Sequence, residues 1–386
     1  MRSVRASRAL TRLPPYPFAA LEEQAAGFRT GQRLLRFAIG DPDLRPPPSL
    51  LRAALQAMRS PDGNRYSSSR GEPELREAFA GWFVRRFGVR VDPTTEVCVL
   101  VGSKEGLAAL PRAILNPGDR VAVPDPGYPA YGNAVLLAGL RTEPLPLDPD
   151  RGWLPRWDRL SRGARLVYLN YPNNPTGALA RRSDLAEAVE RAGQGGFLIA
   201  FDNAYSEITF GPRRAPSILE IPGARDRVIE FHSLSKTLGI AGWRIGFAVG
   251  NAAAIRALTS WKSHSDSGPP KPLQHAAARL LSEYRRGRWP SVVRASIAEY
   301  GRRVRTLARG LGAAGWSVPT PEGTLYLWQP APEGYGTGAQ FARYLLNEHR
   351  ILVTPGEAFG RAGRSYVRWS ATAPIGAIRE AVDRLT

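Results

Sequence analysis

The sequence predicts an α/β protein with a mainly parallel sheet, followed by a smaller α+β unit. Between residues 97 and 250, short apolar runs rich in β-branched residues alternate with helix-like segments, a pattern typical of parallel sheets. After Gln274 this alternation gives way to longer helical stretches. The chain has 386 residues, more than one small core usually holds, so we expect two domains.

The first unit contains apolar runs of strand length. We expect strands at Val97–Val101, Arg120–Pro124, Leu166–Asn170, Phe197–Asp202, Val228–His232 and Ile245–Gly250. Segments rich in Ala and Leu predict helices between them, at Lys104–Leu115, Ala130–Ala138 and Arg181–Ala192. Four polar residues gather where strands end: Ser103, Asn174, Asp202 and Ser233. In open α/β sheets ligands bind at that edge, so we expect the functional site there.

The second unit has fewer strands and more helix. Helices are expected at Ala276–Tyr284, Ser291–Ala314, Gly338–His349 and Ile375–Leu385, and strands at Ser317-Val318, Thr324–Gln329 and Tyr366–Ser370. The segment Pro269–Pro272 cannot continue a helix and lies near the boundary. We expect an arm at residues 1–45 that joins the smaller unit, a large domain at 46–280 and a small domain at 281–386.

Composition excludes several classes of function. The formal net charge of +19 invites a nucleic-acid interpretation, but the arginines are spread along the chain without a basic run interleaved with aromatics, so we expect no nucleic-acid partner. One cysteine and four scattered histidines predict no metal site. The longest apolar runs have strand length, so no membrane association is expected. The basic N-terminus is similar to some transit peptides, but a solvated arm and a cytoplasmic location are favoured.

The choice of cation points to one residue. Of the 53 basic residues 49 are arginines, and the lysines are Lys104, Lys236, Lys262 and Lys271. An amine can lose its proton and attack a carbonyl, whereas a guanidinium stays charged. Lys236 closely follows Ser233 and precedes Arg244 by eight residues. This arrangement suits a Schiff base with an aldehyde that also carries a phosphate.

Several motifs occur in a characteristic order. They are Gly40–Asp43, Gly102–Gly106, Asp125–Pro129, Asn170–Gly177, Asp202–Tyr205, the segment around Lys236, and Tyr366–Arg368. Together they resemble the fold-type I pyridoxal-phosphate aminotransferases of class I and II, from about residue 13 to the C-terminus. The resemblance implies a large domain with a mainly parallel seven-stranded sheet, a smaller α+β domain, pyridoxal 5'-phosphate as cofactor and a homodimer with shared active sites.

The resemblance implies three catalytic residues. Lys236 matches the Schiff-base lysine, whose freed amine moves a proton between the substrate and the cofactor. Asp202 matches the aspartate that keeps the pyridine nitrogen protonated. Tyr205 matches a residue that hydrogen-bonds the cofactor's phenolate oxygen, and Asn174 matches its partner on the other side.

The phosphate and the substrate take the remaining matches. The resemblance assigns the phosphate to Ser103, Lys104 (through its amide), Ser233, Arg244 and, from the neighbouring subunit, Tyr66, while Tyr128 stacks on the ring. A helix N-terminus and an arginine suit a phosphate because free N–H groups and a charged fork both face it. On the substrate side the matches are Gly40, Asn174, Arg368 and Tyr16, with Arg368 holding the α-carboxylate.

Within this family the chain is most similar to the LL-diaminopimelate aminotransferases, which share Leu13–Tyr16 and Phe231–Thr237, among other stretches. The resemblance therefore implies ping-pong transfer from an L-amino acid to a 2-oxo acid such as 2-oxoglutarate. However, Arg70 stands where the relatives place a glutamate that could receive a distal ammonium. This difference has two interpretations. Either the preference for the substrate's side chain has drifted from diaminopimelate to another amino acid, or Arg70 points to solvent and the preference is unchanged. A PLP-dependent β-lyase is the alternative chemistry.

Overall fold

The computed structural model describes residues 4–27, 31–285, 287–316 and 318–386. Its largest sheet has the strand order β2-β9-β8-β7-β6-β3-β4-β5. The strands are β2 (Val97–Val101), β3 (Arg120–Asp125), β4 (Arg141–Asp148), β5 (Leu154–Pro155), β6 (Ala164–Asn170), β7 (Leu198–Asp202), β8 (Val228–Ser233) and β9 (Ile245–Gly250). The neighbours from β8 to β4 run parallel, while β9 is antiparallel to both β8 and β2. The expected mainly parallel sheet is confirmed.

The sheet has eight strands where seven are expected. The additional strand, β5, has two residues and pairs antiparallel with the end of β4. The six strands expected from apolar runs all form, with bounds shifted by no more than two residues. The sequence pattern does not predict strand β4, because Pro144 and Pro146 interrupt its apolar residues.

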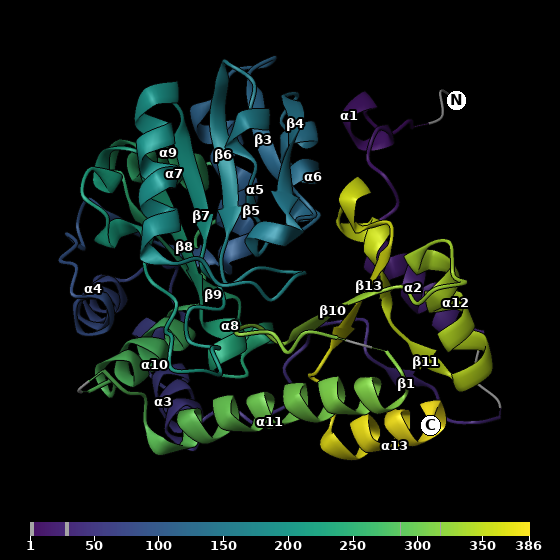
Figure 1. The fold of residues 1–386 in the computed structure, drawn as a ribbon. Coiled ribbons are helices and arrows are strands. Elements are labelled where there is room, and N and C mark those ends of the chain that lie inside the picture. Colours follow the sequence, from purple (N-terminus) through teal and green to yellow (C-terminus); the bar gives the residue numbers. More distant parts are fainter. Residues whose placement is uncertain (1–3, 28–30, 286, 317) are drawn as a thin grey trace.

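Helices cover both faces of this sheet (Figure 1). One face packs against α3 (Pro48–Met58), α4 (Pro73–Phe87), α7 (Arg182–Gly195) and α10 (Lys271–Ser282), and the other against α5 (Ser103–Ile114), α6 (Ala130–Leu137) and α9 (Ala252–Ser263). Neighbouring residues of one strand therefore enter different cores, as Val99 and Leu100 of β2 do. Helix α10 begins at Lys271, with Pro272 in its first turn, where proline is tolerated.

A second group of elements lies beside the sheet (Figure 1). It consists of α11 (Ser291–Ala313), β10 (Tyr326–Pro330), α12 (Gly338–His349), β11 (Ile351–Leu352), β12 (Thr354–Pro355), β13 (Tyr366–Ser370) and α13 (Ile375–Leu385). Strands β10, β13 and β12 form an antiparallel sheet in that order. The strand expected at Ser317-Val318 falls partly outside the described residues, and Val318 belongs to no strand.

The N-terminal segment reaches this second group. It contains α1 (Arg8–Thr11), α2 (Pro17–Ala26) and β1 (Leu35–Arg36), and β1 pairs in parallel with β11. Phe37 is fully buried in the same core as Trp369 of β13. The segment therefore shares a core with the C-terminal elements, while the expected domain bounds stay a prediction.

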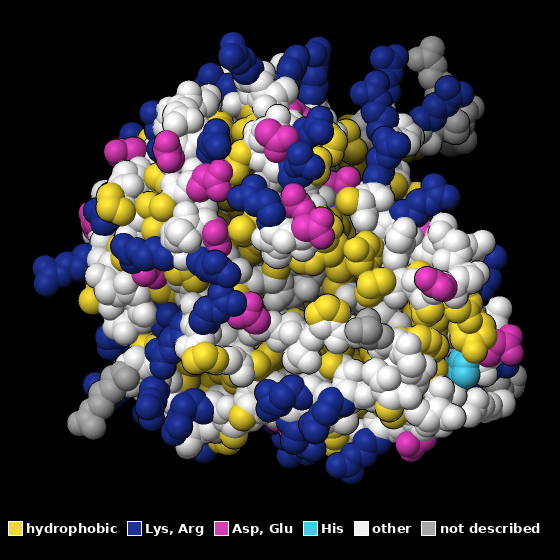
Figure 2. Space-filling model, in the orientation of Figure 1, with side chains coloured by type: hydrophobic (Ala, Val, Ile, Leu, Met, Phe, Trp, Pro, Cys, Tyr) yellow, Lys and Arg dark blue, Asp and Glu magenta, His cyan; other side chains and the backbone are white. Residues whose placement is uncertain are grey.

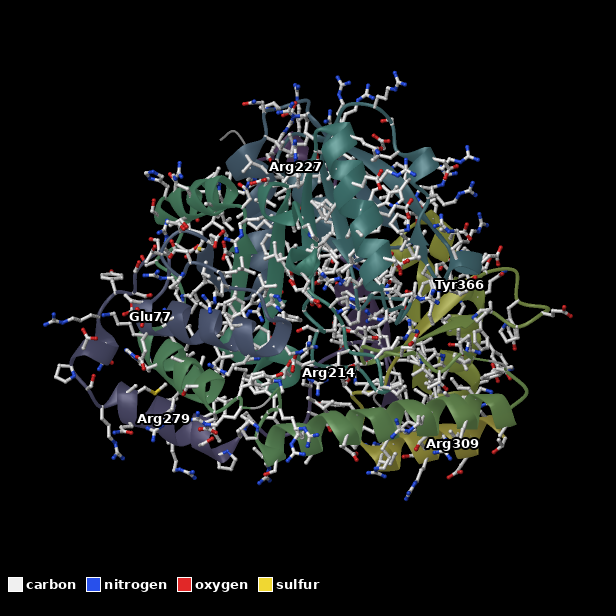
Figure 3. All side chains as sticks on the ribbon, turned by 60° about the vertical axis from the view of Figure 1, so that its left-hand side comes forward. Glu77, Arg214, Arg227, Arg279, Arg309 and Tyr366 are labelled. Atoms are coloured by element: carbon white, nitrogen blue, oxygen red, sulfur yellow. The ribbon has the colours of Figure 1, made fainter. Side chains whose placement is uncertain are left out.

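The positive charge is spread over the surface. Figure 2 shows basic side chains over most of the visible face, with acidic ones among them. The exposed residues Arg227, Arg279 and Arg309 lie on three separate parts of the molecule (Figure 3). Within the described residues, no helix is long and apolar enough to cross a membrane.

Candidate active site

A cavity of about 390 Å³ lies where the strands of the large sheet end. Its walls come from the segments that follow β2, β3, β6, β7 and β8, from the N-terminal segment, and from β10 and β13. The expected site residues that line it are Tyr16, Gly40, Ser103, Lys104, Tyr128, Asn174, Asp202, Tyr205, Ser233, Lys236, Arg244 and Arg368. The structure thus brings together residues that are up to 352 positions apart in the sequence, since Tyr16 and Arg368 both line this cavity.

Lys236 stands in a short helix, α8 (Leu234–Thr237), directly after β8. The Ser233 hydroxyl begins this helix by accepting a hydrogen bond from the Ser235 N–H (3.2 Å). The Lys236 ammonium donates to the Gly40 carbonyl oxygen at 2.6 Å. A Cβ at Gly40 would lie 2.0 Å from the Tyr326 hydroxyl oxygen, so only glycine allows the backbone here to lie against the Tyr326 side chain.

Asp202 ends β7 and is buried. The Tyr131 hydroxyl donates to its Oδ2 at 2.7 Å, and the Ala204 N–H donates to Oδ1 at 3.2 Å. Burial raises the pKa of Asp202 to about 6, although both hydrogen bonds act to lower it. The carboxylate is thus costly to hold ionised without a cation beside it.

This raised pKa predicts a pH-dependent stability of the cofactor-free protein. A carboxyl group that binds its proton more tightly when folded stabilises the fold fully below about pH 4, and this contribution is lost as the pH rises through about 6. The loss amounts to about 3 kcal/mol. The Asp202→Asn variant should not show this loss of stability. Urea unfolding of the wild type and of Asp202→Asn from pH 4 to 7 measures the difference. Parallel stability curves would contradict the expectation.

Two hydrogen-bonded pairs close the wall near Asp202. The hydroxyl groups of Tyr205 and Tyr326 lie 2.9 Å apart. Asn174 accepts a hydrogen bond from Arg368 Nη1 at 2.8 Å, and its own N–H donates to Asn170 Oδ1 at 2.8 Å. The loop that follows β6 is thereby fixed between the two sheets.

One end of the cavity is built for an anion. Ser103 and Lys104 form the first turn of α5, where backbone N–H groups have no partner within the helix. The preceding residue, Gly102, has a φ of +75°, and a Cβ there would lie 2.2 Å from Arg244 Nη2. Because glycine leaves this space, the Arg244 guanidinium can lie against the start of the helix.

Arg368 is a buried cation that has no acidic partner among the residues that the structure describes. Its side chain is 1% exposed, and its Nη2 donates to the Ala38 carbonyl oxygen at 2.6 Å. The guanidinium carbon lies 4.1 Å from the centre of the Tyr326 ring and 4.7 Å from that of Phe359. Its Nε has no hydrogen-bond partner among the described residues. An uncompensated buried charge of this kind favours binding of an anion.

Two expected site residues lie outside the cavity. Tyr66 is 90% exposed. The Arg70 guanidinium donates to the Thr94 carbonyl oxygen and does not line the cavity.

Conversely, Tyr131 and Tyr326 line the cavity without having been expected there. Tyr131 lies in the first turn of α6, three residues after the expected Tyr128, and the two rings are in contact; its closeness in sequence to Tyr128 could have identified it. For Tyr326 the sequence offers no comparable signal.

The charges of the cavity fit pyridoxal phosphate. Four cations line it, namely Lys104, Lys236, Arg244 and Arg368, and the acid among its described lining residues is Asp202. A phosphate matches the helix start and Arg244, and a protonated ring nitrogen matches the buried carboxylate of Asp202. The cations that remain can hold the carboxylates of a substrate.

The sequence profile of the class I and II aminotransferases matches residues 32–385. The chain belongs to this family. It is 41% identical to an LL-diaminopimelate aminotransferase of Desulforudis audaxviator, over 100% of this chain and 98% of that protein. An LL-diaminopimelate aminotransferase of Aquifex aeolicus is 40% identical, over 97% of this chain and 96% of the relative.

Solved structures give the same assignment. Substrate-bound BacF from Bacillus subtilis superposes with a TM-score of 0.94 at 33% identity, over 99% of this chain and 97% of that one. The aspartate aminotransferase of Thermus thermophilus with maleate has a TM-score of 0.91 at 29% identity, over 99% of both chains. This chain is therefore a pyridoxal-phosphate-dependent aminotransferase with the fold expected from its sequence.

Proposed function

We propose that the chain transfers the amino group of LL-diaminopimelate to 2-oxoglutarate. The observation that carries the proposal is a second substrate-facing cation besides Arg368. The Lys104 ammonium lies 3.3 Å from the Tyr16 hydroxyl and 4.9 Å from the centre of its ring, at the cavity wall. Both proposed substrates carry a second carboxylate, which Lys104 can receive while Arg368 holds the first.

We assign the roles of the chain's own residues as follows. When bound, pyridoxal phosphate supplies an aldehyde for the amino group and a ring that withdraws electrons from the substrate's Cα. With the cofactor bound, the Lys236 amine would carry the proton from the substrate's Cα to the cofactor's aldehyde carbon, and would return a proton to the Cα of the new amino acid in the second half of the reaction. Asp202 holds the proton on the ring nitrogen, and Tyr131 keeps its carboxylate in position. Donor and acceptor use Arg368 in turn, so ping-pong kinetics are expected.

A panel of amino donors tests the substrate. With 2-oxoglutarate as acceptor, LL-diaminopimelate should have a kcat/KM at least about tenfold above that of every other donor, because it occupies both carboxylate sites and, unlike the shorter dicarboxylates glutamate and aspartate, the full cavity. The competing candidate, a drift to another amino acid, rests on Arg70 in place of a glutamate. A higher kcat/KM for a donor without a distal ammonium would favour that candidate and overturn the proposal.

Lys104 should affect only acceptors with a distal carboxylate. Lys104→Met is expected to raise the KM for 2-oxoglutarate about tenfold, since one charge-assisted contact is lost. The KM for pyruvate, which has no distal carboxylate, serves as the matched comparison and should stay within about twofold. Steady-state kinetics with both acceptors measure the difference. An equal rise for both would remove Lys104 from the substrate site.

We also propose a homodimer in which Tyr66 completes the site of the partner subunit. Two features support this: the Tyr66 side chain is almost fully exposed, and α3 presents Leu51, Leu55 and Met58 on one partly exposed face. Mixing two weakened variants, Tyr66→Ala and Lys236→Ala, should restore activity, because the mixed dimer holds one site with both residues intact. If activity after subunit exchange does not exceed the sum of the parents, the shared site is excluded.

A further inference from the structure

Lys262 is a buried cation outside the cavity. It stands near the end of α9, is 0% exposed, and its Nζ contacts Glu105 Oε2 at 2.9 Å and the two carboxylate oxygens of Asp266 at 2.9 and 3.1 Å. Burial acts to lower the pKa of Lys262, but Glu105 and Asp266 outweigh it and raise the pKa. The ammonium is therefore charged and bonded to three oxygen atoms.

The choice of lysine at this position is informative. Arginine supplies 49 of the 53 cations, yet lysine stands where the site is closed on all sides. An ammonium is compact and directs three donors to different acceptors, whereas a guanidinium is planar and larger. A buried ion pair is weak support for stability by itself, because desolvation offsets the attraction between the charges. This pair therefore calls for a role beyond stability.

Glu105 connects Lys262 to the cofactor site. Its Oε2 also accepts a hydrogen bond from the Val101 N–H at 3.2 Å, so a single oxygen joins the end of β2, the first turn of α5 and the Lys262 ammonium. Between Val101 and Glu105 lie Gly102, which carries the positive φ and faces Arg244, and the two residues that begin the helix at the cavity. The geometry of this turn decides where the free N–H groups of the helix point.

We propose that Lys262 is a positioning residue for the cofactor phosphate. Through Glu105 it fixes the turn that presents the N–H groups of Ser103 and Lys104 to the phosphate, without touching the phosphate itself. The same ammonium holds Asp266, whose Oδ1 accepts from the Gly268 N–H at 2.7 Å and so shapes the loop after α9. The inference rests on the phosphate position proposed above.

Binding to the cofactor-free protein tests the role directly. For Lys262→Met we expect the Kd of pyridoxal phosphate to rise about tenfold, as for the loss of one hydrogen bond to a charged group. Inorganic phosphate should compete correspondingly less well. The affinity for pyridoxal, which lacks the phosphate, should stay within about twofold. An equal loss for pyridoxal and pyridoxal phosphate would show a general disturbance and overturn the proposal.

Three further variants keep the test decisive. Glu105→Leu removes the bridging oxygen but retains the Lys262–Asp266 pair, and it should fold even where Lys262→Met does not. An affinity for pyridoxal phosphate equal to wild type in this variant would overturn the proposal. Lys271→Met is the matched control, because Lys271 also pairs with two carboxylates, Asp62 (3.2 Å) and Glu72 (3.8 Å), outside the cavity; its phosphate affinity should be unchanged. Arg244→Met distinguishes a failure of this proposal from a failure of the phosphate position on which it rests. If Arg244→Met binds pyridoxal phosphate as tightly as the wild type does, the phosphate position itself is refuted.

Discussion

Replacement of Lys236 by alanine is expected to lower kcat by about 10⁴-fold or more while the protein stays folded. Within the described part of the chain the Lys236 ammonium has one hydrogen-bond partner, the Gly40 carbonyl oxygen, so few interactions are lost with it. The chemistry loses the amine to which we assign the proton transfer at the substrate's Cα. Lys236→Arg should be nearly as inactive, because a guanidinium keeps its proton at neutral pH. Single-turnover absorbance changes after addition of an amino donor measure both rates.

A matched control and a rescue experiment make this expectation specific. Lys271→Ala removes a lysine that lies outside the cavity and should retain wild-type activity. A small primary amine added to Lys236→Ala should restore part of the rate, since it can occupy the vacated space and carry the proton. An alanine variant whose rate stays within about tenfold of wild type would remove Lys236 from the proton-transfer step.

The four lysines share a structural explanation. Lys104 and Lys236 line the cavity, and Lys262 is buried and pairs with Glu105 and Asp266. Lys271 pairs with Asp62 and Glu72, with 12% of its side chain exposed. Lys104 is exposed and contacts Tyr16, so exposure does not separate the lysines from the arginines, but each lysine has defined partners. The compositional bias that draws attention to Lys236 in the sequence applies to the other three as well.

Local motifs explain why much of the site could be predicted from the sequence. Ser103, Asp202 and Ser233 each follow or end an apolar run, and parallel strands end at one edge of a sheet, so their proximity follows from the fold class. The resemblance to the family added Arg368 and Gly40, which belong to other elements.

Packing between distant elements explains what could not be predicted. Tyr326 lines the cavity from β10, which belongs to the smaller sheet, and its hydroxyl meets that of Tyr205 across 121 positions of sequence. Tyr131 contacts the Asp202 carboxylate only because the fold brings α6 close to the end of β7. In the proposed homodimer the position of Tyr66 relative to a site would depend on the second chain, so neither the sequence nor one subunit decides it.

Replacement of Arg368 by methionine is expected to lower kcat/KM for dicarboxylate substrates about 10³-fold, because two charge-assisted hydrogen bonds to the α-carboxylate are lost. Stability should change much less. The guanidinium is 1% exposed and bonded to neutral acceptors, the Asn174 and Ala38 oxygens, and burial lowers the pKa of Arg368. Its charge therefore costs free energy in the absence of a ligand, and an apolar side chain of similar length removes that cost.

Ligand-induced stabilisation distinguishes this interpretation from a purely structural arginine. A dicarboxylate such as 2-oxoglutarate should raise the Tm of the wild-type protein, because it binds only the folded state, and should leave the Tm of Arg368→Met unchanged. Arg368→Lys keeps the charge but not the two-pronged geometry, so its shift should be intermediate. If Arg368→Met unfolds well below the wild-type temperature and still responds to 2-oxoglutarate as the wild type does, the buried guanidinium serves the fold. In that case the substrate carboxylate must be held by another of the cavity's cations.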